Sequence, residues 1–248
     1  MAEVGLELYT VRDETARDFA GTVRKVAALG YPAVEFAGYG DLAAEELRDL
    51  LAETGLRAAA THVSLANLEA DFDRELAYCR TIGCSTLILP WLPPEKRSPE
   101  FLAALAPQLN QFGRQARAAG ITFGYHNHDF EFVLDEGQTL LARLLAATDP
   151  DLVALELDVY WAAYAGFDPI ALLREYAGRA PVVHLKDMDS SRRYTEVGDG
   201  TLDIKAIAAA AKEGGTSWLI VEHDNPTMPS LESAKRSLEN LRGLGIAR

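Results

Sequence analysis

Short apolar segments alternate with amphipathic segments along the chain. The apolar segments are rich in Val, Leu, Ile and Ala, which is typical of buried strands. They cover residues 4–9, 33–36, 56–63, 85–90, 121–126, 152–159, 182–186 and 218–222. The amphipathic segments repeat apolar residues at helical spacing. They predict helices over residues 15–30, 43–53, 68–82, 98–120, 138–147, from 168 onward, 203–212 and 230–241.

Strict alternation of strands and helices predicts parallel strands joined by right-handed crossovers. Two folds fit this pattern, a closed (β/α)8 barrel and an open doubly wound sheet. Eight similar repeats favour the barrel. The first strand is followed by YTVRDE, without the glycines of a dinucleotide-binding turn, and there is no Walker A motif. We therefore predict a single (β/α)8 barrel, a TIM barrel, that forms one domain over residues 1–248.

Helix-terminal residues support these boundaries. Gly30 follows the first helical segment, as expected of a glycine that ends a helix. Ser98-Pro99 and Asp168-Pro169 each combine an N-cap side chain with a proline in the first turn. These signals predict helices that begin after Ser98 and after Asp168.

Histidines gather at the predicted carboxyl ends of the strands, where barrel enzymes place their active sites. In the segment ITFGYHNHDFE, which covers residues 121–131, apolar side chains occupy one face and His126 and His128 fall on the other. A pair of hydrogen-bonded loop histidines is the alternative reading of this segment. All five histidines of the chain lie at such strand ends: His62, His126, His128, His184 and His223.

Acidic residues concentrate at the same ends. In VALELDVYW, Leu155 and Leu157 face the helices, which places Glu156 and Asp158 inside the barrel. The same alternation puts the side chains of His184, Lys186 and Glu222 inside.

Charged groups inside a barrel are costly unless they are paired or bind a metal. We expect Asp158, His184, Glu222 and one residue of the fifth strand to hold a divalent ion such as Mn²⁺, Co²⁺, Zn²⁺ or Mg²⁺. A buried network of ion pairs is the alternative.

Composition narrows the classes of partner. The 248 residues are 48% hydrophobic and carry a formal net charge of −13, which disfavours nucleic acid and anionic membranes. Cys79 and Cys84 form no CxxC motif and are expected to be small buried apolar residues in a reducing compartment. The sequence shows no signal peptide or membrane-spanning run. We expect a soluble cytoplasmic protein, whose helix faces permit a homodimer.

Seven motifs together resemble those of the xylose isomerase-like (sugar phosphate isomerase/epimerase) TIM-barrel family. They are LELYTVRD, ATHVSL, GYHNHDFEF, LELDVYWAAYAGFDP, VVHLKDM, VGDGTLDI and LIVEHD, and they extend over the whole chain. The resemblance implies a divalent metal at the barrel mouth. Its ligands in the family are a Glu, an Asp, a His and a Glu from the fifth to eighth strands.

The last three of these family ligands match Asp158, His184 and Glu222. The fifth strand departs from the family pattern, because the position expected to hold Glu is His126. The candidates for the fourth ligand are, in order, His126, Glu131 and His128.

The resemblance further implies a metal-dependent isomerase or epimerase that acts on a small-molecule sugar, keto-sugar or cyclitol. Glu222 or His126 would remove the proton next to a metal-polarised carbonyl, and Lys186 would stabilise the resulting enediolate. Epimerases of this kind use two glutamates, of which Glu222 alone is matched here. Candidate substrate contacts are His62, His128, Glu131 and Trp161.

Three other functions fit the same barrel. A dehydratase or lyase would act on the same class of substrate, for example an inosose or a 3-keto-glycoside. A phosphoesterase of the apurinic-endonuclease type is opposed by the net charge of −13. A sugar-binding barrel without catalysis is the third.

Overall fold

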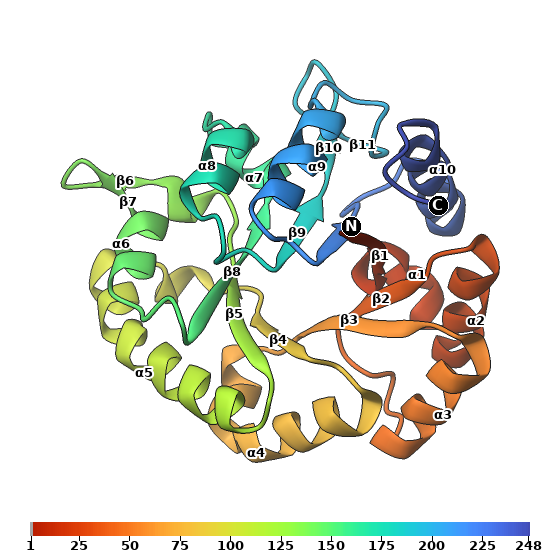
Figure 1. Ribbon diagram of the computed structural model, residues 1–248, viewed down its shortest axis with the longest axis horizontal. Helices are drawn as coiled ribbons and strands as arrows, with labels where there is room; N and C mark the ends of the chain where they lie inside the picture. Colours follow the sequence, from red (N-terminus) through yellow and green to blue (C-terminus); the bar gives the residue numbers. More distant parts are fainter. Residues whose placement is uncertain (1) are drawn as a thin grey trace.

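Eight parallel strands close into a barrel in the computed structural model, which describes residues 2–248. The first strand pairs with the last, with Glu3 opposite Trp218, and this pairing closes the sheet. Figure 1 shows the strands at the centre and the helices around them. The strands are β1 (Glu3–Glu7), β2 (Ala33–Phe36), β3 (Arg57–His62), β4 (Thr86–Leu89), β5 (Thr122–His126), β8 (Val153–Asp158), β9 (Val182–Leu185) and β12 (Trp218–Val221). The predicted TIM-barrel fold is confirmed.

Three helix ends lie at the residues that the sequence signals, whereas the helix expected from residue 15 begins at Phe19. Ser98 accepts a hydrogen bond from Phe101 N (3.2 Å), Asp168 accepts one from Ile170 N (2.8 Å), and Gly30 ends its helix with φ 97°. The helices of the outer layer are α2 (Phe19–Leu29), α3 (Ala44–Thr54), α4 (Leu65–Ile82), α5 (Pro99–Ala118), α6 (Leu140–Ala146), α8 (Pro169–Glu175), α9 (Ile204–Glu213) and α10 (Ser230–Gly243).

The structure corrects several predicted boundaries. The first strand ends at Glu7 instead of residue 9, because the Glu7 carboxylate accepts a hydrogen bond from Tyr9 N (3.1 Å) and turns the chain into the 3-10 helix η1 (Leu8–Val11). The helix expected over 138–147 begins at Leu140, since the two residues before it pair in a hairpin. Helix α4 begins at Leu65, three residues earlier than expected, after the N-cap Ser64.

Short elements that the hydrophobic pattern did not predict decorate the loops. Each has at most six residues, which is fewer than two helical turns and too short for a periodic signal. These elements are α1 (Arg12–Thr15), η2 (Pro94–Lys96), η3 (Phe130–Phe132), α7 (Val159–Tyr164), the hairpin of β6 (Leu134–Asp135) with β7 (Gln138–Thr139), and the hairpin of β10 (Asp187–Met188) with β11 (Tyr194–Thr195).

The core has two layers. Large apolar side chains of the strands, such as Phe123 and Leu155, pack outward against the helices, while a smaller interior cluster includes Ala60, Ile88 and Ile220. Gly124 makes room in that interior, because a Cβ there would lie 2.6 Å from Ile88 Cδ1. This apolar cluster fills the inside of the barrel. The inward-facing polar side chains lie beyond it, toward the carboxyl ends of the strands.

The structure bears on two further features of the sequence, the cysteines and the hydrophobicity of the helices. Cys79 and Cys84 are buried and form no disulfide. Among residues 2–248, every helix is too short or too polar to cross a membrane.

Candidate active site

Ionisable side chains from seven strands, all buried except the partly exposed His62, converge at the carboxyl end of the barrel. The inward direction that alternation predicts for His126, Asp158, His184 and Glu222 is the direction observed, and each is at most 6% exposed. The converging side chains are Glu7, Glu35, His62, His126, Glu156, Asp158, His184, Lys186 and Glu222.

His184 lies at the centre of this group and contacts a carboxylate on each side of its ring. Its Nε2 is 2.6 Å from Glu35 Oε2, and its Nδ1 is 2.7 Å from Glu222 Oε2. Burial alone would lower the pKa of His184, but the carboxylates of Glu156 and Glu35 outweigh burial and hold that pKa well above its usual value. A divalent cation bound here would replace the charge of this imidazolium and release its proton.

His126 contacts the same cluster but stays neutral. Its Nδ1 is 2.9 Å from Glu156 Oε2, and its Nε2 is 3.7 Å from Asp158 Oδ2. Burial lowers the pKa of His126 to about 4. A neutral imidazole is the form of histidine that binds metals.

Lys186 provides the permanent positive charge of the site. Its Nζ lies 2.9 Å from Glu222 Oε2, 3.1 Å from Asp224 Oδ2 and 3.2 Å from Asp158 Oδ2. Burial alone would lower the pKa of Lys186, but Asp158, Glu222 and Asp224 together raise it well above the usual value. The side chain is therefore an ammonium that three carboxylates share.

The donor atoms fit a divalent cation. His184 and His126 each direct one ring nitrogen to a buried carboxylate and the other toward Glu222 or Asp158. Metal-binding histidines usually have such a carboxylate behind them. Asp158 Oδ2 is buried and forms an ion pair with Lys186 Nζ at 3.2 Å, but it accepts no well-aligned hydrogen bond.

The metal candidates also lie close enough together. Ligand atoms of Asp158, His184 and Glu222 lie within 4.8 Å of one another. With His126 beside them, the set offers nitrogen and oxygen without thiolate, which suits Zn²⁺, Mn²⁺, Co²⁺ and Mg²⁺ alike.

The fourth-ligand candidates after His126 lie in different surroundings. The Glu131 carboxylate accepts hydrogen bonds from Tyr125 OH (2.6 Å) and His128 N (2.7 Å), and Tyr125 belongs to the outward, helix-facing layer. Burial raises the pKa of Glu131 to about 8. Glu131 thus fixes the loop after β5 and is not brought together with Asp158 and His184.

The ring of His128 lies beside the rings of His126 and Trp161. Its ring centroid is 5.0 Å from that of His126 and 5.5 Å from that of Trp161, and its Nδ1 is buried without a hydrogen-bond partner. Burial lowers the pKa of His128 well below its usual value, so the ring is neutral.

Aromatic side chains form a wall beside Lys186. The ammonium lies 5.7 Å from the centre of the Trp161 ring, and the indole Nε1 is buried without a partner. Tyr160 stacks on Tyr194 of the β10–β11 hairpin at 4.5 Å. Trp161 is positioned by its backbone, because its N–H donates to Asp158 Oδ1 (3.0 Å) at the start of α7. Such a wall suits the apolar face of a sugar ring.

His62 joins the cluster from β3. Its Nε2 is 2.6 Å from Glu156 Oε2 and 3.2 Å from Glu35 Oε1. Burial alone would lower the pKa of His62, but Glu35 and Glu156 raise it well above the usual value. His62 therefore contacts the carboxylates behind the metal candidates.

Several residues of the site escaped sequence reasoning. Asn127 binds the backbone of Asp158 from both sides, accepting from its N–H (3.1 Å) and donating to its C=O (3.4 Å). Asp224 accepts a hydrogen bond from Lys186 Nζ. Its position two residues after Glu222 could have indicated that both side chains point to the same side. Glu7 was a single acid in an apolar strand, and burial raises its pKa well above the usual value.

The loop VGDGTLDI has a structural role in this fold. The Asp187 carboxylate accepts hydrogen bonds from the backbone N–H groups of Met188 (2.8 Å), Gly198 (3.0 Å), Gly200 (3.1 Å) and Leu202 (3.2 Å). A Cβ on Gly200 would overlap the Asp187 carboxylate. The glycines therefore allow the loop to wrap around one buried acid.

Known proteins resemble this chain in sequence. The inosose dehydratase of Geobacillus kaustophilus (strain HTA426) is 29% identical over 240 aligned positions, which cover 80% of this chain and 77% of that protein. The inosose dehydratase of Lacticaseibacillus casei is 31% identical over 137 positions, which cover 48% of this chain and 45% of that protein. The chain thus spans about half the length of the second relative.

Solved structures share the fold. A sugar phosphate isomerase/epimerase from Parabacteroides distasonis ATCC 8503 superposes with a TM-score of 0.86 at 24% identity, over 100% of both chains. The IOLI protein with a binding zinc atom superposes with a TM-score of 0.77 at 15% identity, over 98% of this chain and 97% of that one. The sequence pattern of the xylose isomerase-like TIM barrel matches residues 23–244. The chain belongs to the xylose isomerase-like TIM-barrel family.

Proposed function

We propose that the chain is a divalent-metal-dependent dehydratase that acts on a keto-sugar or a keto-cyclitol. The observation that carries the proposal is the grouping of Asp158, His184 and Glu222 around the ammonium of Lys186. Two relatives named inosose dehydratase and a neighbour that holds zinc support it.

The metal candidates are Asp158, His184 and Glu222, with His126 as the fourth. A divalent ion held by them would supply Lewis-acid polarisation of the substrate carbonyl. Glu35 and Glu156 orient the two imidazoles through the nitrogens that face away from the other candidates. The buried surroundings strengthen each of these electrostatic contacts.

Glu222 accepts the proton from the carbon next to the carbonyl. The electron pair of that C–H bond moves toward the carbonyl oxygen and gives an enediolate, whose negative charge the Lys186 ammonium stabilises. The enediolate then re-forms the carbonyl, the bond to the hydroxyl group on the next carbon breaks, and Glu222 returns its proton to the departing oxygen to give water. One carboxyl group thus serves as base and then as acid on the same face of the ring.

This use of one group favours elimination over epimerisation. Epimerisation needs acid–base groups on opposite faces of the substrate, and His126 stands where the family resemblance implies the second glutamate. Elimination of a hydroxyl on the same face of the ring as the removed proton needs no second group, because Glu222 both takes up that proton and returns it to the departing oxygen.

An isomerase or epimerase is the second candidate. The buried, neutral and unpartnered Nδ1 of His128 favours it, since this nitrogen could exchange a proton with the other face of the substrate. The two reactions differ in their products. In deuterium oxide, an isomerase or epimerase yields a product that gains carbon-bound deuterium and keeps all its oxygens, whereas a dehydratase yields a product that has lost water.

Metal content is the first test. We expect about one equivalent of divalent metal in the purified protein and its loss in His184→Ala and Asp158→Ala. Glu239→Ala, a change of an exposed acid on α10, is the matched control and should retain the ion. Keto-sugars and inososes should then be screened by mass spectrometry with that metal supplied. A wild-type protein that binds no divalent ion, even after incubation with Mn²⁺, would refute the proposed chemistry.

A further inference from the structure

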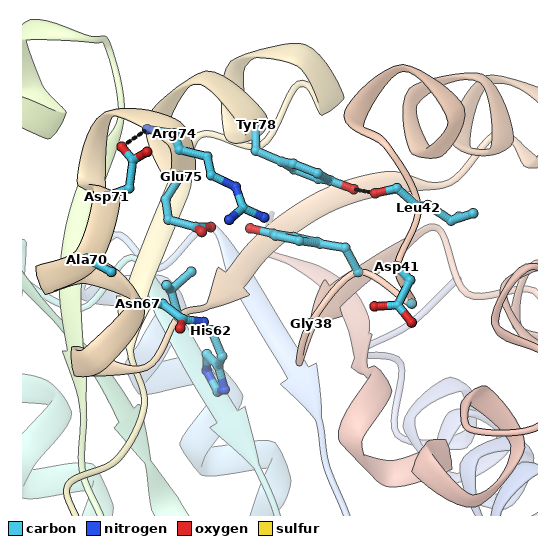
Figure 2. Close-up of a pocket in the computed structure, with 13 residues that line it drawn as sticks. Gly38, Asp41, Leu42, His62, Asn67, Ala70, Asp71, Arg74, Glu75 and Tyr78 are labelled. Carbon is cyan, nitrogen blue, oxygen red and sulfur yellow. Dashed lines mark hydrogen bonds between the residues drawn. The ribbon is translucent and has the colours of Figure 1, made fainter.

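A cavity of about 560 Å³ opens beside the buried cluster, between the loop after β2 and the helix α4. Its lining includes His62, whose ring is the link to the site described above. Figure 2 shows Arg74 and Glu75 reaching from α4 toward this loop, with His62 below them. The cavity therefore adjoins the group of metal candidates and carboxylates through His62.

The cavity has a fixed aromatic wall. Tyr39 and Tyr78 stack at 3.9 Å with an interplanar angle of 14°. Tyr78 OH donates a hydrogen bond to Leu42 O (2.9 Å), which ties α4 to the loop, and Tyr39 OH accepts one from Thr61 Oγ1 (3.1 Å) at the end of β3. Both rings are held in place by the protein itself, so a ligand would meet a prepared surface.

A break in α4 shapes the other side. The backbone of Asp71 is non-helical (φ −161°, ψ 82°), and its carboxylate accepts a hydrogen bond from Arg74 N (3.0 Å) to restart the helix. The small side chain of Ala70 precedes this break and lines the cavity. The interruption of the helix and the absence of a large side chain at residue 70 together leave the space open.

The charges in the lining exclude one class of ligand. Asp41, Asp71 and Glu75 place three carboxylates there against the guanidinium of Arg74 and the imidazole of His62, whose Nε2 already contacts Glu35 and Glu156. A phosphate group would be repelled by this balance, whereas the hydroxyl groups of a neutral sugar can donate to carboxylates and accept from the guanidinium. An aromatic wall with such polar groups is typical of a carbohydrate subsite.

His62 sets the direction in which a substrate would extend. Its ring stacks 5.4 Å from that of His184 with an interplanar angle of 15°, and its side chain keeps 11% exposure. His62 belongs both to the lining of the cavity and to the cluster around His184, so a substrate that occupied both places would extend past this ring.

We propose that this cavity binds a neutral, ring-sized polyhydroxyl group joined to the reacting unit, so that the substrate is a keto-glycoside with two rings and not a sugar phosphate. The assignment rests on the proposed function for its reacting unit. The available volume agrees with it, because ligand sites generally measure roughly 300–1,000 Å³.

Binding of unreactive sugars tests the cavity without any turnover. Calorimetric titration would compare cellobiose, trehalose and sucrose with glucose and glucose 6-phosphate, using metal-supplemented wild-type protein, Ala70→Trp and Ala77→Trp. The indole at residue 70 fills the cavity, while residue 77 is an exposed position of the same helix outside the lining and is the matched control.

We expect at least one disaccharide to bind about tenfold more tightly than glucose and glucose 6-phosphate in the wild type and in Ala77→Trp. In Ala70→Trp this ratio should fall to about one. Equal affinities for all sugars, tighter binding of glucose 6-phosphate, no measurable disaccharide binding, or an unchanged ratio in Ala70→Trp would each overturn the assignment.

Turnover separates the two proposals. Matched keto-sugars with and without a second ring would be assayed with the same three proteins. A retained binding preference without turnover of any keto-sugar would reject the dehydratase and keep the subsite. Turnover without a preference for two rings would reject the subsite and keep the dehydratase.

Discussion

Replacing Lys186 by Met should destabilise the metal-free protein strongly. The change keeps most of the side-chain volume but removes the ammonium that contacts Asp158, Glu222 and Asp224 within 3.2 Å. Removing one partner of a buried ion pair costs about 3–5 kcal/mol. For a chain of this size, each 1 kcal/mol shifts the melting temperature by about 2–4 °C. The expected decrease is therefore about 6–20 °C.

A divalent ion should reverse much of this loss. In the wild type, the Lys186 ammonium competes with a metal ion for the carboxylates of Asp158 and Glu222. The substitution removes this competition. At a free ion concentration about 100 times its dissociation constant, binding stabilises the folded state by about 2.7 kcal/mol. Because Lys186→Met binds the ion more tightly, Mn²⁺ should raise its melting temperature by more than it raises that of the wild type.

Thermal unfolding of chelator-treated protein, followed by circular dichroism with and without Mn²⁺, measures both effects. Lys205→Met, a change of an exposed lysine on α9, is the control and should shift the melting temperature by less than about 2 °C. The reasoning is refuted if metal-free Lys186→Met melts within about 2 °C of the wild type. It is also refuted if Mn²⁺ raises both melting temperatures equally.

Three further changes have expected outcomes. Glu35→Gln should weaken metal binding about 10–100-fold in a competition titration with a chelator, because His184 loses the carboxylate behind its Nε2. Burial raises the pKa of Glu131 to about 8, so the contribution of Glu131 to stability is present at acid pH and is lost as the pH rises through 8. Glu131→Gln should therefore flatten the dependence of the melting temperature on pH between about 5 and 8. Gly124→Ala should cost about 1–3 kcal/mol in urea unfolding, since the new Cβ would lie 2.6 Å from Ile88 Cδ1.

Alternation along the strands predicted the inner face of the site because each strand places successive side chains on opposite faces. Leu155 and Leu157 pack outward in the structure, which fixes Glu156 and Asp158 inside. The repeat pattern also predicted the closed barrel, since the order of strands and helices does not depend on side-chain detail.

Loop residues could not be placed from the sequence in the same way. Glu131 is five residues beyond His126, and its direction depends on the turn η3 and on the hydroxyl of Tyr125. Asn127 acts through hydrogen bonds to a strand 31 residues away, a contact that spacing does not reveal. The cavity depends on the break at Asp71, where the sequence shows an uninterrupted amphipathic pattern.

The Asp187 carboxylate has a consequence for amide exchange with solvent. Backbone N–H groups in a loop usually exchange quickly, because no ladder protects them. The N–H groups of Gly198, Gly200 and Leu202 instead end on one buried acid, so each exchanges only when that acid is released. These three amides should exchange together and more slowly than the amide of Ser190, which lies in the exposed turn after β10. One buried acid thus holds the root of the β10–β11 hairpin, and Tyr194 pairs with Met188 beside that root.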